Sequence, residues 1–189
     1  AVDTAVQSAF LKANTRNELM VIETDERLAR TIPPGQVLKI KIEVDTDPPP
    51  GFATATRFLL QPIPFAVRCY TLPSLFAGKL HALLFRRWNN RVKGRDWYDL
   101  VWYAAHHPQL NLAHLEQRMR QTGHWSGDAC LTRVAFDELI QSAIDRLDLD
   151  QARQDIAPFV KDQQALAIWS REFFRDVASR IIIVEEQEA

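Results

Sequence analysis

The apolar residues of this chain change their spacing once, near residue 70, and this change limits the folds that the chain can adopt. Over residues 37–45, aliphatic and charged residues alternate with the two-residue period of a half-buried strand. From residue 72 onward, apolar residues recur every three to four positions, as on one face of a helix. Strands followed by helices predict an α+β fold, with a β-rich part over residues 1–70 and a helical domain over residues 71–189.

Turn and cap residues divide both parts into smaller elements. The apolar runs 8–13 and 19–23 have the length of strands, and prolines at positions 62 and 64 make segment 58–67 an edge strand or an extended loop. Pro73 suits the first turn of a helix. Further helices are expected over residues 95–106, 112–120, 132–147 and 163–182.

Charge and cysteine content exclude several classes of protein. The net charge of −1 gives no overall basic field, so any nucleic-acid site must be local. Two cysteines without metal-ligand spacing favour a reducing, cytoplasmic setting, and no apolar run is long enough to span a membrane. The chain starts without Met and without a signal pattern, and we expect it to be cut from a longer protein.

One lysine falls among the apolar residues of the helix predicted from residue 72. At 100° per residue, Lys79 lies between Phe76 and Leu83, and Arg86 follows one turn later along the same edge. A buried lysine is costly unless a carboxylate or a bound phosphate meets it. The alternative, equally compatible with the position, is a lysine that extends past its neighbours to water or pairs with a structural acid. His81 is expected on the polar side.

Two aspartates begin the next predicted helix, on one side of it. Asp96 lies in the first turn, where an acid usually caps free N–H groups, and this is the favoured interpretation. Asp99 lies too deep to be a simple cap, so it needs a partner, either Lys79 or a metal ion.

Two polar surfaces complete the candidates. Segment 86–95 holds five cations in ten residues, which suits phosphate contacts, although such a loop is more often only solvated. On strand 37–45, Glu43 and Asp45 share the polar face with Lys41, and neighbouring acids can hold Mg²⁺. A solvent-exposed face of alternating charge is the alternative.

Three motifs, in this order, resemble the AbiEii/AbiGii family of bacterial nucleotidyltransferase toxins, from type IV toxin–antitoxin and abortive-infection systems. KIKIEVD (39–45) resembles the family's KIEI strand. FAGKLHALLFR (76–86) resembles its A-E-K-x-x-A-L-x-x-R helix, and GRDWYDL (94–100) its R-D-x-x-D-L motif. The resemblance covers about residues 37–107 and indicates the C-terminal portion of such a toxin, in which residues 1–70 are the remainder of a nucleotidyltransferase sheet.

The resemblance implies an activity and a set of site residues. The family is similar to polymerase-β-type enzymes, which implies Mg²⁺-dependent transfer of a nucleotide from an NTP to an acceptor such as tRNA, and an antitoxin protein as partner. By resemblance, Lys79 contacts the triphosphate, Asp99 is an essential acid, and Glu43 is the strand carboxylate, with Asp45 as a further metal ligand. The expected substrate-binding residues are Lys41, Arg86, Arg87, Arg91, Lys93, Arg95 and Asp96.

The sequence departs from the family pattern in two places. Gly78 stands where the family often has Glu, and no Gly-Ser turn followed by Asp-x-Asp precedes the three motifs. Because that turn carries the principal metal ligands in the family, these 189 residues alone are expected to be inactive. The alternative function is a non-catalytic module that binds an antitoxin or RNA.

Overall fold

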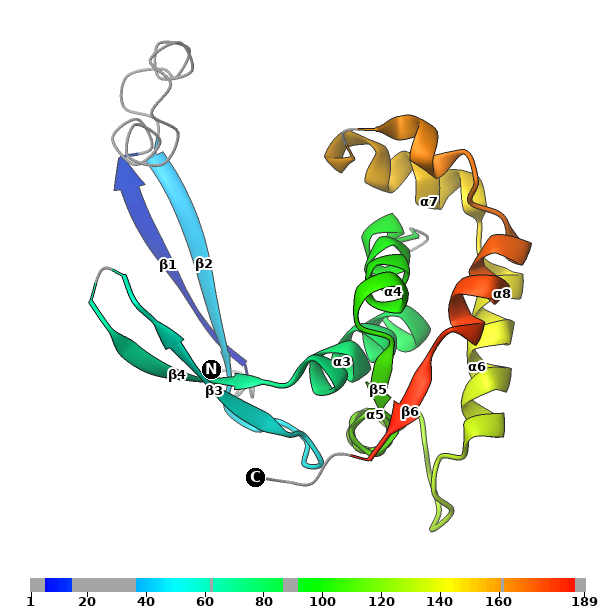
Figure 1. Ribbon diagram of the computed structural model, residues 1–189, viewed down its shortest axis with the longest axis horizontal. Coiled ribbons are helices and arrows are strands. Elements are labelled where there is room, and N and C mark those ends of the chain that lie inside the picture. The colour runs from blue at the N-terminus through cyan, green and yellow to red at the C-terminus, as the bar shows by residue number, and fades with distance from the viewer. Residues whose placement is uncertain (1–5, 15–36, 62, 87–91, 161, 186–189) are drawn as a thin grey trace. The chain divides into compact units, whose positions relative to one another are not determined.

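The computed structural model describes residues 6–14, 37–61, 63–86, 92–160 and 162–185 (Figure 1). It divides into two compact units, residues 1–48 and 49–189. Both strands and helices are present, which confirms the α+β class. This division differs from the boundary expected at residue 70, since the strands after residue 50 fall in the same unit as the helices.

The first unit contains one antiparallel pair of strands, described here by its backbone. Strand β1 (Val6–Asn14) pairs with β2 (Val37–Asp45), so that Val6 lies opposite Asp45 and Asn14 opposite Val37. The strand predicted from the alternating pattern of residues 37–45 is therefore confirmed with the same bounds. The strand expected over residues 19–23 lies outside the described residues.

The second unit begins with a hairpin of β3 (Thr54–Leu59) and β4 (Phe65–Tyr70), with Leu59 opposite Phe65. The single strand or extended loop expected over residues 58–67 is wrong, because the chain reverses within that segment. Proline lacks an N–H group to donate within a strand, so a proline-rich stretch suits the connection between two strands.

Six α-helices follow the hairpin in the described part of the chain: α3 (Leu72–Phe85), α4 (Gly94–His106), α5 (Leu112–Gln121), α6 (Arg133–Arg146), α7 (Leu149–Ile156) and α8 (Arg171–Ser179). Two 3₁₀ turns, η1 (Ala157–Phe159) and η2 (Gln163–Leu166), lie between α7 and α8. Strands β5 (Gln109–Asn111) and β6 (Ile182–Val184) pair in parallel.

The single helix expected over residues 163–182 is wrong. The backbone instead forms η2, stops, and begins again at α8, whose N-cap Ser170 accepts a hydrogen bond from the Phe173 N–H at 3.0 Å. Residues 182–184 then pair with β5 in place of continuing the helix. A local capping signal and a strand partner 73 residues away in the sequence thus override the helical spacing of the apolar residues.

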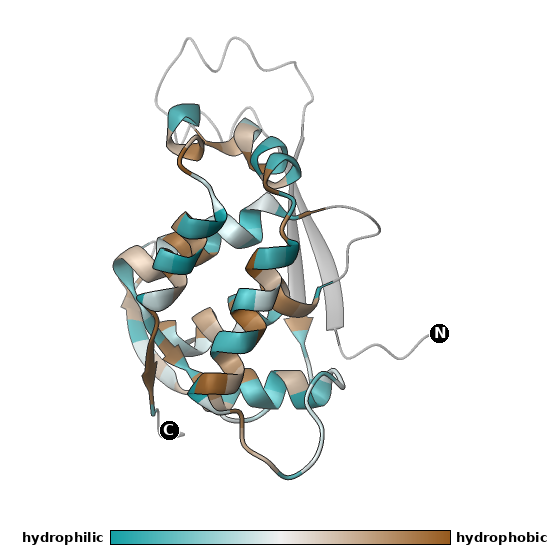
Figure 2. Ribbon diagram, turned by 90° about the vertical axis from the view of Figure 1, so that its right-hand side faces the viewer, coloured by the Kyte–Doolittle hydropathy of each residue, from teal (hydrophilic) through white to brown (hydrophobic). Residues whose placement is uncertain are grey.

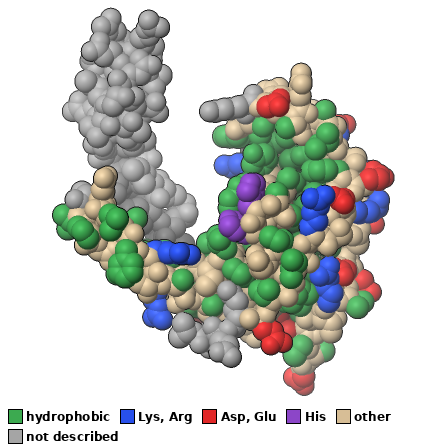
Figure 3. Space-filling view, in the orientation of Figure 1, with side chains coloured by type: hydrophobic (Ala, Val, Ile, Leu, Met, Phe, Trp, Pro, Cys, Tyr) green, Lys and Arg blue, Asp and Glu red, His purple; other side chains and the backbone are tan. Residues whose placement is uncertain are grey.

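The helices of the second unit enclose one apolar core. Its fully buried side chains include Phe76 and Leu80 of α3, Phe136 of α6 and Phe174 of α8. Most helices carry both hydrophobic and hydrophilic residues along their length, as expected when one face is buried (Figure 2). The hairpin differs, because Phe58, Leu60 and other apolar residues gather exposed at its tip (Figure 3).

Candidate nucleotide-binding pocket

Helices α3 and α4 pack against each other and bring Lys79 and Asp99 together (Figure 1). Lys79 Nζ donates to Asp99 Oδ2 at 2.7 Å, which is one of the two alternatives expected for an acid too deep in its helix to be a cap. The Lys79 side chain is 51% exposed and that of Asp99 32%. Of the two alternatives for Lys79, the structure therefore agrees with the exposed one, because α3 buries Phe76, Ala77 and Leu80 and leaves Lys79 at the edge.

The start of α4 is fixed by its contact with α7. A Cβ atom on Gly94 would lie 2.0 Å from the carbonyl oxygen of Ala152, so only glycine allows the two helices to approach this closely. The Gly94 N–H also donates to Asp155 Oδ2 at 3.1 Å, and the Val92 N–H donates to Gln151 Oε1 at 3.3 Å. These contacts place the R-D-x-x-D-L residues beside α7.

A pocket of about 530 Å³ opens where α3, α4 and the α7–η1 segment meet. One part of its lining is charged and consists of Lys79, Arg86, Lys93, Arg95, Asp96 and Asp99. The other part is apolar or aromatic and consists of Tyr98, Ile156, Phe159 and Val160. Six residues proposed from the sequence thus line one cavity, with four cations against two acids. Arg87 and Arg91 lie outside the described residues.

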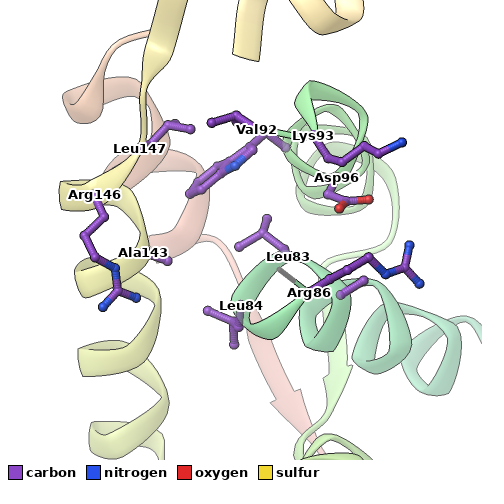
Figure 4. Close-up of a pocket in the computed structure, with 11 residues that line it drawn as sticks. Leu83, Leu84, Arg86, Val92, Lys93, Asp96, Ala143, Arg146 and Leu147 are labelled. Carbon is purple, nitrogen blue, oxygen red and sulfur yellow. The ribbon is translucent and has the colours of Figure 1, made fainter. Parts of the chain in front are cut away.

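A second cavity of about 190 Å³ adjoins the first and shares Arg86, Lys93 and Asp96 with it (Figure 4). Its remaining lining is mostly apolar, including Leu83 and Val92. In Figure 4, the charged ends of the three shared residues point to the same side, away from Leu147. The same three residues therefore border both cavities.

Asp96 lies in the first turn of α4, as expected, but it is not the N-cap residue. The N-cap residue of α4 is Lys93, whose side chain makes no capping hydrogen bond, and Asp96 lies half-buried in the first turn. Burial raises the pKa of Asp96 above its usual value, while Arg86 opposes this increase. The nearby Asp99 carboxylate adds to the increase, and Lys79 and Lys93 oppose it. The carboxyl group thus lies within the field of the pocket cations.

The strand candidates belong to the other unit. In the backbone register, Lys41 lies opposite Phe10, Glu43 opposite Ser8 and Asp45 opposite Val6. The exposed Asp45 accepts a hydrogen bond from the Asp47 N–H at 3.1 Å through Oδ1. Asp45-Thr46-Asp47 is also an Asp-x-Asp sequence, although it ends the KIKIEVD strand instead of preceding it and has no Gly-Ser turn before it.

A comparison with known protein families agrees with the resemblance inferred from the three motifs. The family model described as nucleotidyl transferase AbiEii toxin, type IV TA system, matches residues 6–177. The chain belongs to the AbiEii family. No curated protein and no solved structure matches it. Membership implies an antitoxin partner and an NTP substrate. Within the described part of the chain, no helix is long and apolar enough to cross a membrane.

The departure at Gly78 from the AbiEii helix motif has a structural counterpart. A Cβ atom on Gly78 would lie 3.7 Å from Cζ of Arg118, which is ordinary van der Waals contact. The buried Arg118 Nε has no hydrogen-bond partner among the described residues. The side chain of a glutamate at position 78 would therefore start beside the guanidinium group of Arg118. In this AbiEii chain, glycine has no side chain to make that contact.

The prediction that His81 lies on the polar side of its helix is wrong. His81 is half-buried, and its Nε2 lies 2.9 Å from the hydroxyl of Thr122, close to α5, instead of facing water. The pKa of His81 is lowered to about 4, mainly by burial and secondly by the nearby charge of Arg118. Its helical neighbours Ala77 and Phe85 are apolar, which was the available signal for a buried position.

Proposed function

We propose that this protein is a nucleotidyltransferase toxin that transfers a nucleotide from an NTP to an RNA acceptor such as tRNA. The observation that carries the proposal is the Lys79–Asp99 pair, at 2.7 Å, within a pocket lined by four cations. Phosphoryl chemistry depends mainly on positioning and on charge stabilisation around phosphates, and clustered cations suit this task.

Each residue of the pocket has a proposed part in the reaction. Lys79 and Arg86 bind phosphate oxygens of the NTP, and Lys93 and Arg95 extend the cationic surface toward the acceptor. The acceptor hydroxyl oxygen forms a bond to the α-phosphorus, and the bond to pyrophosphate breaks. Pyrophosphate leaves, and the hydroxyl proton passes to solvent. Asp99 holds Lys79 in place between turnovers.

Mg²⁺ is the proposed cofactor, with Glu43 and Asp45 supplying carboxylate oxygens from β2. The donor chemistry fits, since Mg²⁺ prefers oxygen ligands. Among the described residues, however, no group of three or more His, Cys, Asp or Glu side chains is arranged to hold a metal ion. No step above is therefore assigned to the metal. We also propose that the 189 residues by themselves transfer no nucleotide. Incorporation of labelled nucleotide by the purified chain would contradict this and would direct attention to Asp45 and Asp47.

The experiment that tests the function uses the protein produced from its complete gene. Lys79→Met and Asp99→Asn each remove one half of the ion pair with little change in volume. We expect both variants to lose growth arrest and nucleotide incorporation, while thermal unfolding stays within a few degrees of the natural protein. Full toxicity of Lys79→Met in a folded protein would contradict the assignment of the site.

A further inference from the structure

The pocket beside Lys79 has an aromatic wall that the chemistry above does not use. Tyr98 and Phe159 both line the pocket, and they are 41% and 67% exposed. Aromatic side chains of this size are normally covered by other apolar groups. Two exposed aromatic rings in the same cavity therefore indicate a ligand-binding surface.

This aromatic wall is joined to the charged one through α4. Arg95, Tyr98 and Asp99 are three and four residues apart, so they share one face of the helix. The guanidinium carbon of Arg95 lies 5.2 Å from the ring centroid of Phe159, a cation–π contact that links α4 to η1. The Gly94–Asp155 hydrogen bond holds the α7 side of the pocket against the same helix end.

The two walls match the two halves of a nucleotide. Lys79, Arg86 and Lys93 provide charge for phosphates, whereas Tyr98 and Phe159 provide flat apolar surface. A cavity of about 530 Å³ is within the usual size range of small-molecule sites. We propose that Tyr98 and Phe159 form the platform on which the base of the NTP stacks. This inference rests on the proposed function and adds the residues that bind the base.

Stacking on an aromatic ring tolerates every base, because each base has a π-face. The platform therefore contributes affinity for all four NTPs and little for a phosphate chain without a base. This difference separates a base platform from a residue that only supports the fold, since a fold defect would weaken both ligands equally.

The test compares NTPs with inorganic triphosphate by calorimetry, using the protein from its complete gene. The double variant Tyr98→Leu, Phe159→Leu keeps apolar volume but removes both rings. We expect NTP affinity to fall by about tenfold or more, with triphosphate affinity unchanged. Tyr98→Phe and Phe159→Tyr, which keep the rings, should retain NTP binding. Trp102→Leu is the matched control, because Trp102 is also on α4 and also 41% exposed but does not line the pocket.

The outcomes separate this inference from the proposed function. If the natural protein binds no NTP, both fail. If it binds NTP through Lys79 and the double leucine variant binds NTP equally well, the base platform alone is overturned. A variant that keeps NTP affinity but loses affinity for a short single-stranded RNA would assign the rings to the acceptor, which also overturns the inference. An equal loss of affinity for NTP and for triphosphate would indicate a general defect of the pocket, and this result would also overturn the inference.

Discussion

Two ion pairs between helices have the same length but different surroundings. Lys79 of α3 meets Asp99 of α4, and Arg175 of α8 meets Asp145 of α6, each with an N–O distance of 2.7 Å. The side chains are 51% and 32% exposed in the first pair, and 43% and 58% in the second. Exposed pairs of this kind contribute about 0–1 kcal/mol to stability, so neither is needed for the fold.

What separates the two pairs is the cavity around them. Lys79 and Asp99 line the 530 Å³ pocket together with three further cations, whereas Arg175 and Asp145 are not part of its lining. The length of an ion pair therefore does not identify a functional site, but its neighbours do. Substitutions that change the pocket without touching the ion pair, and changes in charge or pH around the pair, therefore test this difference between the two sites.

The largest effect is expected from Gly94→Ala. Its new Cβ would lie 2.0 Å from the Ala152 carbonyl oxygen, so α4 and α7 must separate and both walls of the pocket shift. Overpacking of this kind costs about 1–3 kcal/mol of unfolding free energy, and we expect nucleotide incorporation to fall with it. The measurements are urea unfolding and labelled-nucleotide transfer by the full protein.

Gly78→Ala is the matched control for this variant, since the new Cβ has room beside Arg118. A helical Gly→Ala change with room should stabilise the protein by about 0.5–1 kcal/mol. If both variants unfold like the natural protein, the close contact between α4 and α7 does not set the pocket geometry.

A smaller effect is expected from the basic segment 86–95. Replacing Arg87, Arg91 and Lys93 together by Ala should weaken tRNA binding and reduce the salt dependence by about one counterion for each lost phosphate contact. Filter binding at several salt concentrations measures both quantities. The control removes three cations elsewhere, at Arg57, Arg175 and Arg180. Equal behaviour of the two triple variants would remove this segment from the RNA-binding surface.

The smallest effect concerns His81 and pH. Its pKa is about 4 in the folded protein against 6.5 ordinarily, so between these values the unfolded chain binds more protons. Stability should therefore fall as pH decreases from about 6.5 toward 4. The charged or titratable neighbours that lower this pKa are Arg118, His124, Arg86 and His114. His81→Gln should flatten the pH profile of thermal unfolding, and an unchanged profile would contradict the buried neutral imidazole.

The sequence predicted the elements whose signals are local. The alternation in residues 37–45, Pro73 and the R-D-x-x-D-L start identified β2, α3 and α4, and gave Lys79 as one of two possible partners of Asp99. Elements that depend on distant partners were missed, including the β5–β6 pair and the turn between β3 and β4. Helical spacing alone also left open whether Lys79 is buried or exposed, because it does not show where the neighbouring helix ends.

From the sequence, only those site residues that belong to one of the motifs or to the basic segment between them could be predicted. Phe159 lies 60 residues beyond Asp99 and enters the pocket because Gly94 lets α7 approach α4, which no local pattern reveals. Whether Glu43 comes within reach of Lys79 stays a prediction.

The most direct test of the central claim is the affinity of the full protein for an NTP in two matched variants, Lys79→Met and Arg175→Met. Each loses one cation from an interhelical pair of 2.7 Å. Hydrogen bonds to charged groups contribute about 1.5–3 kcal/mol, so calorimetry should show a loss of about tenfold or more for Lys79→Met. Arg175→Met should bind like the natural protein. Equal NTP affinity in both variants would contradict the assignment of the Lys79–Asp99 pocket as the nucleotide site.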